Sequence, residues 1–553
     1  MTKFNLFSSV TNELFSSSDE QKNFEAVLKA IDPDKIPLFR DDEKLEEVFL
    51  NNNIHKFAEK KFRVKLLEGA FGTKRFNDYV FKRGLKLIPK SSTDKEKVDF
   101  LEKIEDYTWT DNQPTQIFID SFELGNGFIP KKTIESDIEI LEKPSSTYYQ
   151  LFDYQSEIFL KTKSMLFHPS SRQIIRVPTG GGKTKIAMEI VTDFLILNED
   201  STVVWLAETS ELLEQATSEF KKIWSHRGNK NIYLNRAWGT KSSIKSTLSG
   251  SKIIIAGLPK MLSFLRNSGK LKANLIVFDE AHHAAAPQYS KAIDSLSNMS
   301  TKVLGLTATP GRGQESETKK LSEIFNDNVP IQIDTHDQSV SPIKFLQRKG
   351  VLAQLIFKNP IAITEISEKF TQDEINTLLK VSEYNDRKIL YKIGKDHLRN
   401  VKILKILLEL AKNKKHVLYF GTSVEQSHLM YMLLTNFGIK AGVIDEDTPE
   451  EYRVELISKF QKKEIQILLN FRVLVAGFDA PAIDTIFIAR PTKSANTLMQ
   501  MIGRGMRGPI VEGGTESCDI YHVKDEFLSR FQNFDELYRT YDEYYEREDF
   551  VNR

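Results

Sequence analysis

Short, almost wholly apolar runs are the feature that most restricts how this chain can fold. The first set consists of QIIRV from Gln173, TVVWLA from Thr202, KIIIA from Lys252 and LIVFD from Leu275. Longer helical patterns separate these runs, which is typical of parallel strands whose two faces are both covered. After a charged helical stretch the alternation restarts, with HVLYF from His416, AGVI from Ala441, IQILLN from Ile465 and TIFIA from Thr485. We therefore predict an α/β protein with two tandem parallel-sheet units.

The chain is too long for a single hydrophobic core. It has 553 residues, and a typical size of ~150 residues per domain predicts about three or four domains. We expect an N-terminal accessory domain at 1–140, the two α/β units at 141–337 and 338–525, and an acidic, aromatic helix or tail at 526–553. The boundary near 338 rests on the polar stretch THDQSVSP, which contains Pro342.

Charge and cysteine content exclude several classes of function. The net charge is only +1, so any nucleic-acid binding must depend on a local groove instead of an overall field. The single cysteine, Cys518, excludes an internal disulfide and a Cys-based zinc site, and we expect it in the core beside a strand. No signal peptide and no apolar stretch of ~18 residues is present, so we expect a cytoplasmic protein without a membrane segment.

A basic, aromatic stretch lies in the N-terminal region. Between His55 and Lys90 there are eleven Lys or Arg residues against three acids. Six aromatic residues interleave with these charges: Phe57, Phe62, Phe71, Phe76, Tyr79 and Phe81. Two interpretations stay open, a DNA-binding surface with stacking groups or a helical module whose Phe residues form its own core. The acidic stretch at 94–111 would offset the positive field if it folds nearby.

The segment VPTGGGKT, from Val177 to Thr184, carries the strongest local signal. It follows the apolar run IIRV and precedes a helical pattern, which is the strand–loop–helix context of a phosphate-binding loop. Three glycines, Gly180, Gly181 and Gly182, would let backbone N–H groups face a phosphate at the helix N-terminus. Lys183 would reach the β- and γ-phosphates of ATP, and the Thr184 hydroxyl would bind Mg²⁺.

A second apolar run, LIVFDEAHH, ends in two carboxylates. Asp279 would hold the Mg²⁺ shell, and Glu280 would orient and activate the attacking water. Two histidines follow, but without a nearby cysteine or a metalloprotease spacing a zinc site is not expected. We expect His282 to transmit the state of the nucleotide to the next motif.

These segments, with others in the same order along residues 152–507, resemble superfamily 2 helicases and translocases. The further segments are WLAETSELLEQ from Trp205, LTATP from Leu306, YFGTSVEQ from Tyr419, GFDAP from Gly477 and QMIGRGMRG from Gln500. The resemblance implies two RecA-like domains with an ATP site at their interface, and it implies a role for each matching residue. The adenine-reading element would be Phe152, Tyr154 and Gln155; the other ATP-binding positions would include Thr179, Gly477, Asp479 and Gln500; the coupling residues would be Thr307 and Thr309; and the nucleic-acid contacts would be Thr209, Ser210, Thr422 and Ser423.

The resemblance also assigns Arg504 and Arg507 as arginine fingers. They lie in the second α/β unit, so they would complete the ATP site only when the two units close. Such fingers stabilise charge on the transferring phosphoryl group and contribute about 10³ to 10⁵ in rate. Hydrolysis would thereby be tied to domain closure and to movement along a strand.

Among superfamily 2 branches, the chain looks closest to the helicase subunits of type I and type III restriction enzymes and their stand-alone bacterial relatives. SPIKFLQRKGVLAQ and RGPIVEGGTES carry this similarity. It implies double-stranded or forked DNA as the track. Our hypothesis is a DNA helicase or translocase that uses ATP and Mg²⁺ in repair, recombination or defence against foreign DNA. A motor that displaces proteins, an ATP-gated DNA sensor and an RNA helicase stay open as alternatives. A protein partner, such as a nuclease or defence effector, would bind at residues 1–140 or at the C-terminal tail.

Overall fold

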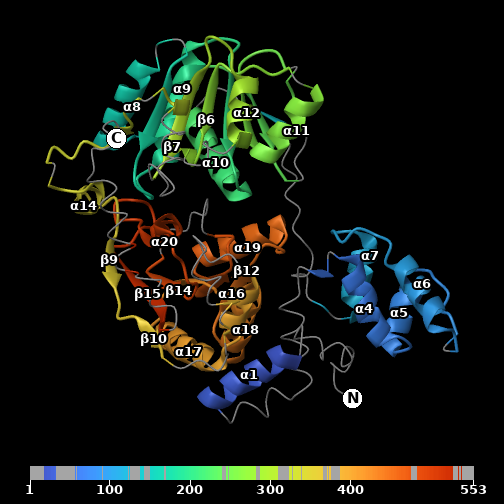
Figure 1. Cartoon of the computed structure of the whole chain (residues 1–553). Helices are drawn as coiled ribbons and strands as arrows, with labels where there is room; N and C mark the ends of the chain where they lie inside the picture. The colour runs from blue at the N-terminus through green and yellow to red at the C-terminus, as the bar shows by residue number, and fades with distance from the viewer. Residues whose placement is uncertain are drawn as a thin grey trace.

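The computed structural model contains two α/β units and a separate group of N-terminal helices (Figure 1). It describes residues 18–32, 56–122 apart from 58 and 90, 124, 138–141, 150–239 apart from 167 and 169, 244–281 apart from 247 and 269, 287–308, 323–364 apart from 327 and 338, 370–374 apart from 372, 387–474, 483–526, 534 and 537.

The first unit is built on an eight-stranded sheet in the order β1-β4-β5-β3-β6-β7-β2-β8. Its strands are β1 (Ile138–Leu141), β2 (Arg172–Arg176), β3 (Thr202–Ala207), β4 (Ile232–Ala237), β5 (Lys252–Gly257), β6 (Leu275–Phe278), β7 (Lys302–Thr307) and β8 (Ile331–Gln332). Only β1 pairs antiparallel to its neighbour among these strands. The helices of this unit are α8 (Asp153–Met165), α9 (Lys183–Leu197), α10 (Ser210–Arg227), α11 (Leu258–Ser268) and α12 (Pro287–Leu296). The expected parallel sheet is present.

Helices cover both faces of this sheet, which explains why its strands are apolar throughout. All six residues of β3 are buried. Val203 and Trp205 join the core that also contains residues of α9 and α10, whereas Val204 and Leu206 join the core that contains residues of α11 and α12. Successive side chains of a strand point to opposite faces, so a strand buried on both sides loses the usual apolar–polar alternation.

The second unit is built on a seven-stranded parallel sheet. Its strands are β9 (Gln354–Phe357), β10 (Ile361–Ile363), β11 (Val417–Phe420), β12 (Ala441–Ile444), β13 (Ile467–Asn470), β14 (Thr485–Ile488) and β15 (Ser517–Asp525). The helices are α14 (Pro342–Arg348), α16 (Arg387–Gly394), α17 (His397–Lys412), α18 (Val424–Asn436), α19 (Glu450–Gln461) and α20 (Ala495–Ile502), followed by the 3₁₀ turn η5 (Gly503–Gly505). The central order is β15-β14-β11-β13-β12. Each strand that was expected from the sequence at 416–488 is present.

The first 140 residues divide among different parts of the structure. Helix α1 (Ser18–Ile31) packs against α17 and α18 of the second unit, and its Phe24, Val27 and Leu28 are buried. Strand β1 lies at the edge of the first sheet. The remaining helices, α4 (Lys60–Ala70), α5 (Lys74–Lys82), α6 (Asp94–Ile104) and α7 (Gln113–Phe122), lie together beside the two units (Figure 1). Helices α4 to α7 therefore form a helical module of their own within the first 140 residues.

Most aromatic residues of the basic N-terminal stretch form the core of this helical module. Phe57, Phe76 and Tyr79 are fully buried, and Phe118 packs edge-on against both Phe57 and Tyr79. Phe81, in contrast, is 79% exposed. Helix α6 packs against α4, and Lys60 of α4 pairs with Asp106 from the acidic stretch at 94–111. These contacts favour the packing interpretation for the aromatic residues.

Arg63 is part of this core and not of a basic surface. Its side chain is fully buried, its Nε donates to Glu105 Oε2 at 2.7 Å, and Nη1 donates to the Phe57 carbonyl at 2.6 Å. The Tyr79 hydroxyl donates to the other Glu105 oxygen. Burial and the Glu105 charge raise the pKa of Tyr79 far above its ordinary value, so Tyr79 remains a neutral donor. The contribution of Arg63 to a nucleic-acid surface is thus excluded by this arrangement.

Two further expectations concern single residues and membranes. Cys518 lies fully buried in β15, as expected, and burial raises the pKa of its thiol well above the usual range. Among the described helices, none is long and apolar enough to span a bilayer. Of the C-terminal stretch at 526–553, the structure describes residues 526, 534 and 537 only. Phe534 is buried, and its ring stacks on His522 of β15 with centroids 4.0 Å apart.

Replacing Glu105 by Ala should unfold the helical module locally, because it leaves the buried Arg63 guanidinium without its carboxylate. Breaking a buried ion pair from one side costs about 3–5 kcal/mol. Hydrogen exchange of peptides from 56–122 in the full chain measures this as a loss of protection of roughly 100-fold or more. Asp106→Ala is the matched control, because Asp106 is 78% exposed in its pair with Lys60, and such pairs contribute about 0–1 kcal/mol. Equal protection in the two variants would contradict the prediction.

Candidate functional site

The predicted phosphate loop joins β2 to α9. In the first sheet, β2 lies between β7 and β8. Gly180 and Gly182 have φ angles of 83° and 84°, which glycine adopts without strain. Gly182 is also the N-cap of α9, and a Cβ added there would lie 2.3 Å from Gln155 Nε2. Glycine is therefore needed at residue 182 for its backbone angle and for its small size.

Lys183 begins α9 and is almost completely buried. It is 9% exposed, and its Nζ donates to the Val177 carbonyl at 3.2 Å. Burial lowers the pKa of this ammonium group, the charges of Glu280 and Asp279 partly restore it, and Arg504 lowers it further. A cation held in this way gains stability when an anionic ligand such as a phosphate reaches it.

Two carboxylates follow β6 directly, at the edge of the sheet where the phosphate loop also begins. Asp279 is 3% exposed, and its N–H donates to the Leu206 carbonyl at 3.0 Å. Glu280 has a φ of 57°, and its N–H donates to Asp279 Oδ1 at 3.2 Å. A left-handed angle at a residue other than glycine costs about 1–3 kcal/mol and is common at functional sites. The left-handed angle at Glu280 turns the chain sharply, directly after the end of β6.

The predicted adenine-reading residues contact the phosphate loop in this structure. Tyr154 is 6% exposed, and its hydroxyl donates to the Gly181 carbonyl at 2.8 Å. Gln155 is 2% exposed; its Oε1 accepts from the Phe152 N–H at 3.0 Å, and its Nε2 donates to Tyr154 Oη at 3.2 Å and to the Gly181 carbonyl at 3.3 Å. The Phe152 and Tyr154 rings stack on each other, with centroids 6.1 Å apart. Tyr154 is therefore too buried to stack on a base, and the half-buried Phe152 is the aromatic residue that can do so.

The second unit brings the backbone segment that carries its predicted arginines close to the phosphate loop. Arg504 lies in η5, and a Cβ added at the preceding Gly503 would lie 2.3 Å from Thr179 Cγ2 in the loop. A Cβ added at Gly180 would lie 2.8 Å from Leu352, and Leu352 pairs with Arg507 in an isolated antiparallel bridge. Residues of both units therefore surround one loop. Gln500, near the end of α20, is half-buried.

The structure describes only some of the other predicted ATP-binding and coupling residues. Thr307 is the last residue of β7, and its carbonyl accepts from the Val177 N–H at 3.2 Å, which places it beside the phosphate loop. Thr184 follows Lys183 and is half-buried. His282, Thr309, Gly477 and Asp479 lie outside the described residues.

The predicted nucleic-acid contacts fall into two groups. Thr209 and Ser210 are half-buried at the start of α10, where Thr209 Oγ1 accepts from the Leu212 N–H at 3.3 Å. In the second unit, Thr422 is fully buried and Ser423 is 5% exposed, and Ser423 Oγ accepts from the Gln426 N–H as the cap of α18. The hydroxyls of Thr422 and Ser423 already bind protein groups inside the fold, and their contact with a nucleic-acid strand stays a prediction.

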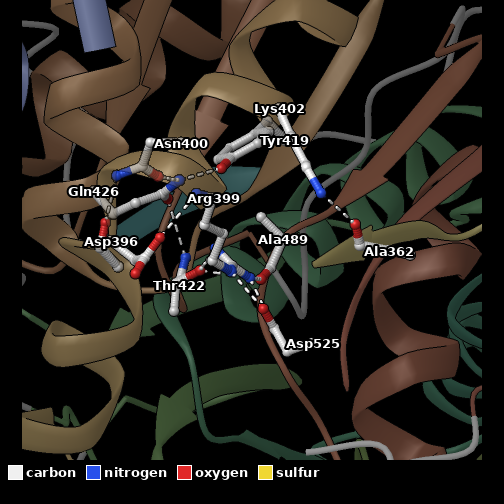
Figure 2. Close-up of polar contacts among 11 residues, drawn as sticks. Ala362, Asp396, Arg399, Asn400, Lys402, Tyr419, Thr422, Gln426, Ala489 and Asp525 are labelled. Carbon is white, nitrogen blue, oxygen red and sulfur yellow. Dashed lines mark hydrogen bonds and ion pairs between the residues drawn. The ribbon is translucent and has the colours of Figure 1, made fainter. Parts of the chain in front are cut away.

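Arg399 is the residue at this edge of the second sheet that the sequence motifs did not reveal. Its guanidinium is fully buried and donates to both carboxylate oxygens of Asp525, at 2.8 and 3.2 Å, to Thr422 Oγ1 at 3.0 Å and to the Ala489 carbonyl (Figure 2). These partners follow or end the adjacent strands β11, β14 and β15. A sequence signal existed, because Arg399 shares a helical face with the apolar Ile403.

Comparison with known proteins supports the ordered motifs. Residues 148–312 match the family model described as the res subunit of type III restriction enzymes, and residues 399–508 match the conserved C-terminal domain of helicases. IRC3 of Saccharomyces cerevisiae, named as an ATP-dependent helicase, is 26% identical over 370 residues, which cover 65% of this chain and 49% of that protein. Irc3 of Schizosaccharomyces pombe, named as a mitochondrial ATP-dependent helicase, is 28% identical over 388 residues, 68% of this chain and 57% of that protein. The chain thus spans about half the length of these curated relatives.

A fragment of an HsdR subunit of a type I restriction enzyme from Vibrio vulnificus superposes with a TM-score of 0.47 at 17% identity, covering 71% of this chain and 67% of that one. The wider set of relatives includes proteins named as DNA helicases and others named as RNA helicases.

Gly182→Ala should abolish binding of a fluorescent adenine nucleotide, because the added methyl group would collide with Gln155 and would strain the first turn of α9. Gly438→Ala is the matched control. Gly438 also has a positive φ, 77°, but nothing lies within 4 Å of an added Cβ, so this variant carries the backbone cost alone. Nucleotide titrations of both variants by fluorescence anisotropy check the prediction, which fails if the Gly182 variant binds as tightly as the control.

Proposed function

We propose that this chain, which belongs to helicase superfamily 2 and has restriction-enzyme-like relatives, is a DNA-stimulated ATPase that moves on duplex or forked DNA. The close approach of Gly503 to Thr179 in the phosphate loop, with the Arg504 charge acting on Lys183, carries the proposal. An arginine supplied by the second unit makes hydrolysis depend on how the two units lie, which is the basis of a motor. The match to a restriction-enzyme family favours DNA as the track and a role in repair, recombination or defence against foreign DNA.

In this mechanism the phosphates of ATP bind at the N-terminus of α9. Backbone N–H groups of the glycine loop and the buried Lys183 ammonium neutralise the β- and γ-phosphates. Burial lowers the pKa of Lys183, and the charges of Glu280 and Asp279 oppose that shift and so favour the ammonium form. Phe152 is placed to pack against the adenine ring.

The residues beside the loop fit a magnesium ion. The Thr184 hydroxyl and the Asp279 carboxylate are hard oxygen donors, and Mg²⁺ commonly takes only one or two carboxylates with phosphates and waters. No group of three or more His, Cys, Asp or Glu side chains that could form a closed metal site occurs among the described residues, which agrees with such an open arrangement. When bound, Mg²⁺ would neutralise charge on the β- and γ-phosphates.

Glu280 is the group assigned to accept the proton of the attacking water. The sharp turn at Glu280 places its carboxylate within electrostatic reach of Lys183. Arg504 and Arg507 would stabilise the charge that develops on the phosphoryl oxygens during transfer. Since both arginines belong to the second unit, loss of the products releases the contact that favours closure.

The test is ATP hydrolysis by the full chain with no nucleic acid, single-stranded DNA, duplex DNA, forked DNA and RNA of matched sequence. We expect duplex or forked DNA to raise kcat, and Lys183→Ala to abolish turnover on every substrate. Stimulation by RNA alone would replace DNA by RNA as the track. No stimulation by any nucleic acid would contradict a motor and favour a sensor that needs a partner such as a nuclease.

Glu280→Gln should retain ATP binding and lose at least about 100-fold in turnover, because the amide keeps the size of the side chain but cannot take the proton. Glu199→Gln, at an exposed position of the same unit, is the control. Binding of ATP by equilibrium dialysis and phosphate release in single-turnover experiments separate the two steps. Wild-type turnover in the Glu280 variant would remove its role as base.

A further inference from the structure

A second contact between the two α/β units lies away from the phosphate loop. Arg453 on α19 of the second unit forms an ion pair, through Nη1, with Glu211 Oε1 on α10 of the first unit. The side chains are only 16% and 12% exposed, respectively. Exposed ion pairs contribute little because water screens them, whereas this pair is largely shielded from solvent.

The Arg453 guanidinium is held in place by its own unit. Its Nη2 donates to the Asp445 carbonyl at 3.4 Å and to the Thr448 carbonyl at 3.3 Å. Asp445 Oδ1 accepts from the Asp447 and Thr448 N–H groups at 3.0 and 2.9 Å, and Asp445 Oδ2 lies 2.6 Å from His428 Nε2. A guanidinium oriented by such a turn loses less freedom when it pairs with a carboxylate across an interface.

Glu211 lies in the first turn of α10, directly after Thr209 and Ser210. A carboxylate in this position interacts favourably with the positive end of the helix dipole. Because Thr209 and Ser210 are assigned to contact a nucleic-acid phosphate, the ion pair adjoins the place where a strand would meet the first unit. Glu211 is therefore next to the predicted track, and Arg453 reaches it from the opposite unit.

The two interunit contacts are well separated along one edge of the first sheet. The phosphate loop follows β2 and α10 follows β3, with β6 and β7 between these strands. Neighbouring strands lie about 4.8 Å apart, so the two contacts are separated by roughly 14 Å. A single contact leaves two bodies free to pivot about it, whereas two contacts at this separation restrict the angle between them.

We propose that Glu211 and Arg453 are positioning residues that hold the second unit at the angle at which Arg504 reaches the phosphate loop. This inference rests on the proposed function, since it concerns how hydrolysis depends on closure. Loss of the pair should leave ATP binding by the first unit unchanged and should reduce the fraction of closed molecules. The expected signature is a lower kcat for DNA-stimulated hydrolysis at an unchanged KM for ATP.

A charge exchange tests the pair. Glu211→Arg and Arg453→Glu should each lower the DNA-stimulated kcat about tenfold or more, with KM for ATP within about twofold of wild type. The double variant Glu211→Arg/Arg453→Glu should recover at least half of the wild-type kcat. The control is Glu455→Arg/Lys459→Glu, which exchanges a more exposed pair within α19. Wild-type rates in the single variants, or low rates in the double variant, would overturn the proposal.

A distance measurement keeps this result separate from the proposed function. Spin labels at Ser218→Cys and Lys462→Cys, two exposed positions on α10 and after α19, report the angle between the units, and the native Cys518 is buried and should not be labelled. In the presence of a non-hydrolysable ATP analogue, Glu211→Arg or Arg453→Glu in the labelled protein should broaden the distribution of distances between the two labels. The charge-exchange double variant should narrow this distribution again. Absence of DNA-stimulated ATP turnover in the wild-type protein would refute the proposed motor function but not the positioning role of the ion pair. An unchanged distance distribution in Glu211→Arg and Arg453→Glu would refute the positioning role of this ion pair.

Discussion

The Lys183 ammonium is the charge around which the rest of the site is organised. Burial makes this cation costly, and the nearby carboxylates, the Val177 carbonyl and a bound phosphate would offset the cost. Strand β6 delivers both carboxylates, because Asp279 and Glu280 follow its last residue. The left-handed turn at Glu280 is a local cost that the surrounding packing has to support, whereas Gly180 and Gly182 adopt positive φ angles without strain. The strained backbone therefore lies where the chemistry requires closely spaced charges.

The second unit also affects the charge of Lys183, through Arg504. Arg504 lowers the pKa of Lys183 further, because the positive charges of the two residues repel each other. A triphosphate would convert this repulsion into two attractive interactions, and closure would then be favoured only while the anion is present. Coupling of closure to nucleotide state follows from the charges themselves, because the same arginine opposes closure in one state and stabilises it in the other.

The sequence predicted the fold because its strands are buried on both faces and its loops carry a motif. The two parallel sheets are confirmed by the structure, and the matches to family models over 148–312 and 399–508 support the resemblance to helicases. Motifs could not report burial. Arg63 looks like a surface charge in its sequence neighbourhood, yet its partner Glu105 lies 42 residues away. Thr422 matches a motif, yet its hydroxyl donates to the Ala489 carbonyl at 3.0 Å. Both outcomes depend on contacts between distant segments. The roles of the ATP-site residues stay predictions.

Arg399 shows how a buried charge outside the motifs can fix the position of a motif's backbone. If Thr422 binds inside the fold, the motif YFGTSVEQ acts through the position of its backbone and not through that hydroxyl. Arg399 fixes this position, because it ties Thr422, Ala489 and Asp525 together where three parallel strands end (Figure 2). A buried arginine is costly without full hydrogen bonding, so the network tolerates few alternative arrangements of these strand ends. Its rigidity would make the second unit move as one body, which is what a contact such as Glu211–Arg453 needs in order to transmit an angle.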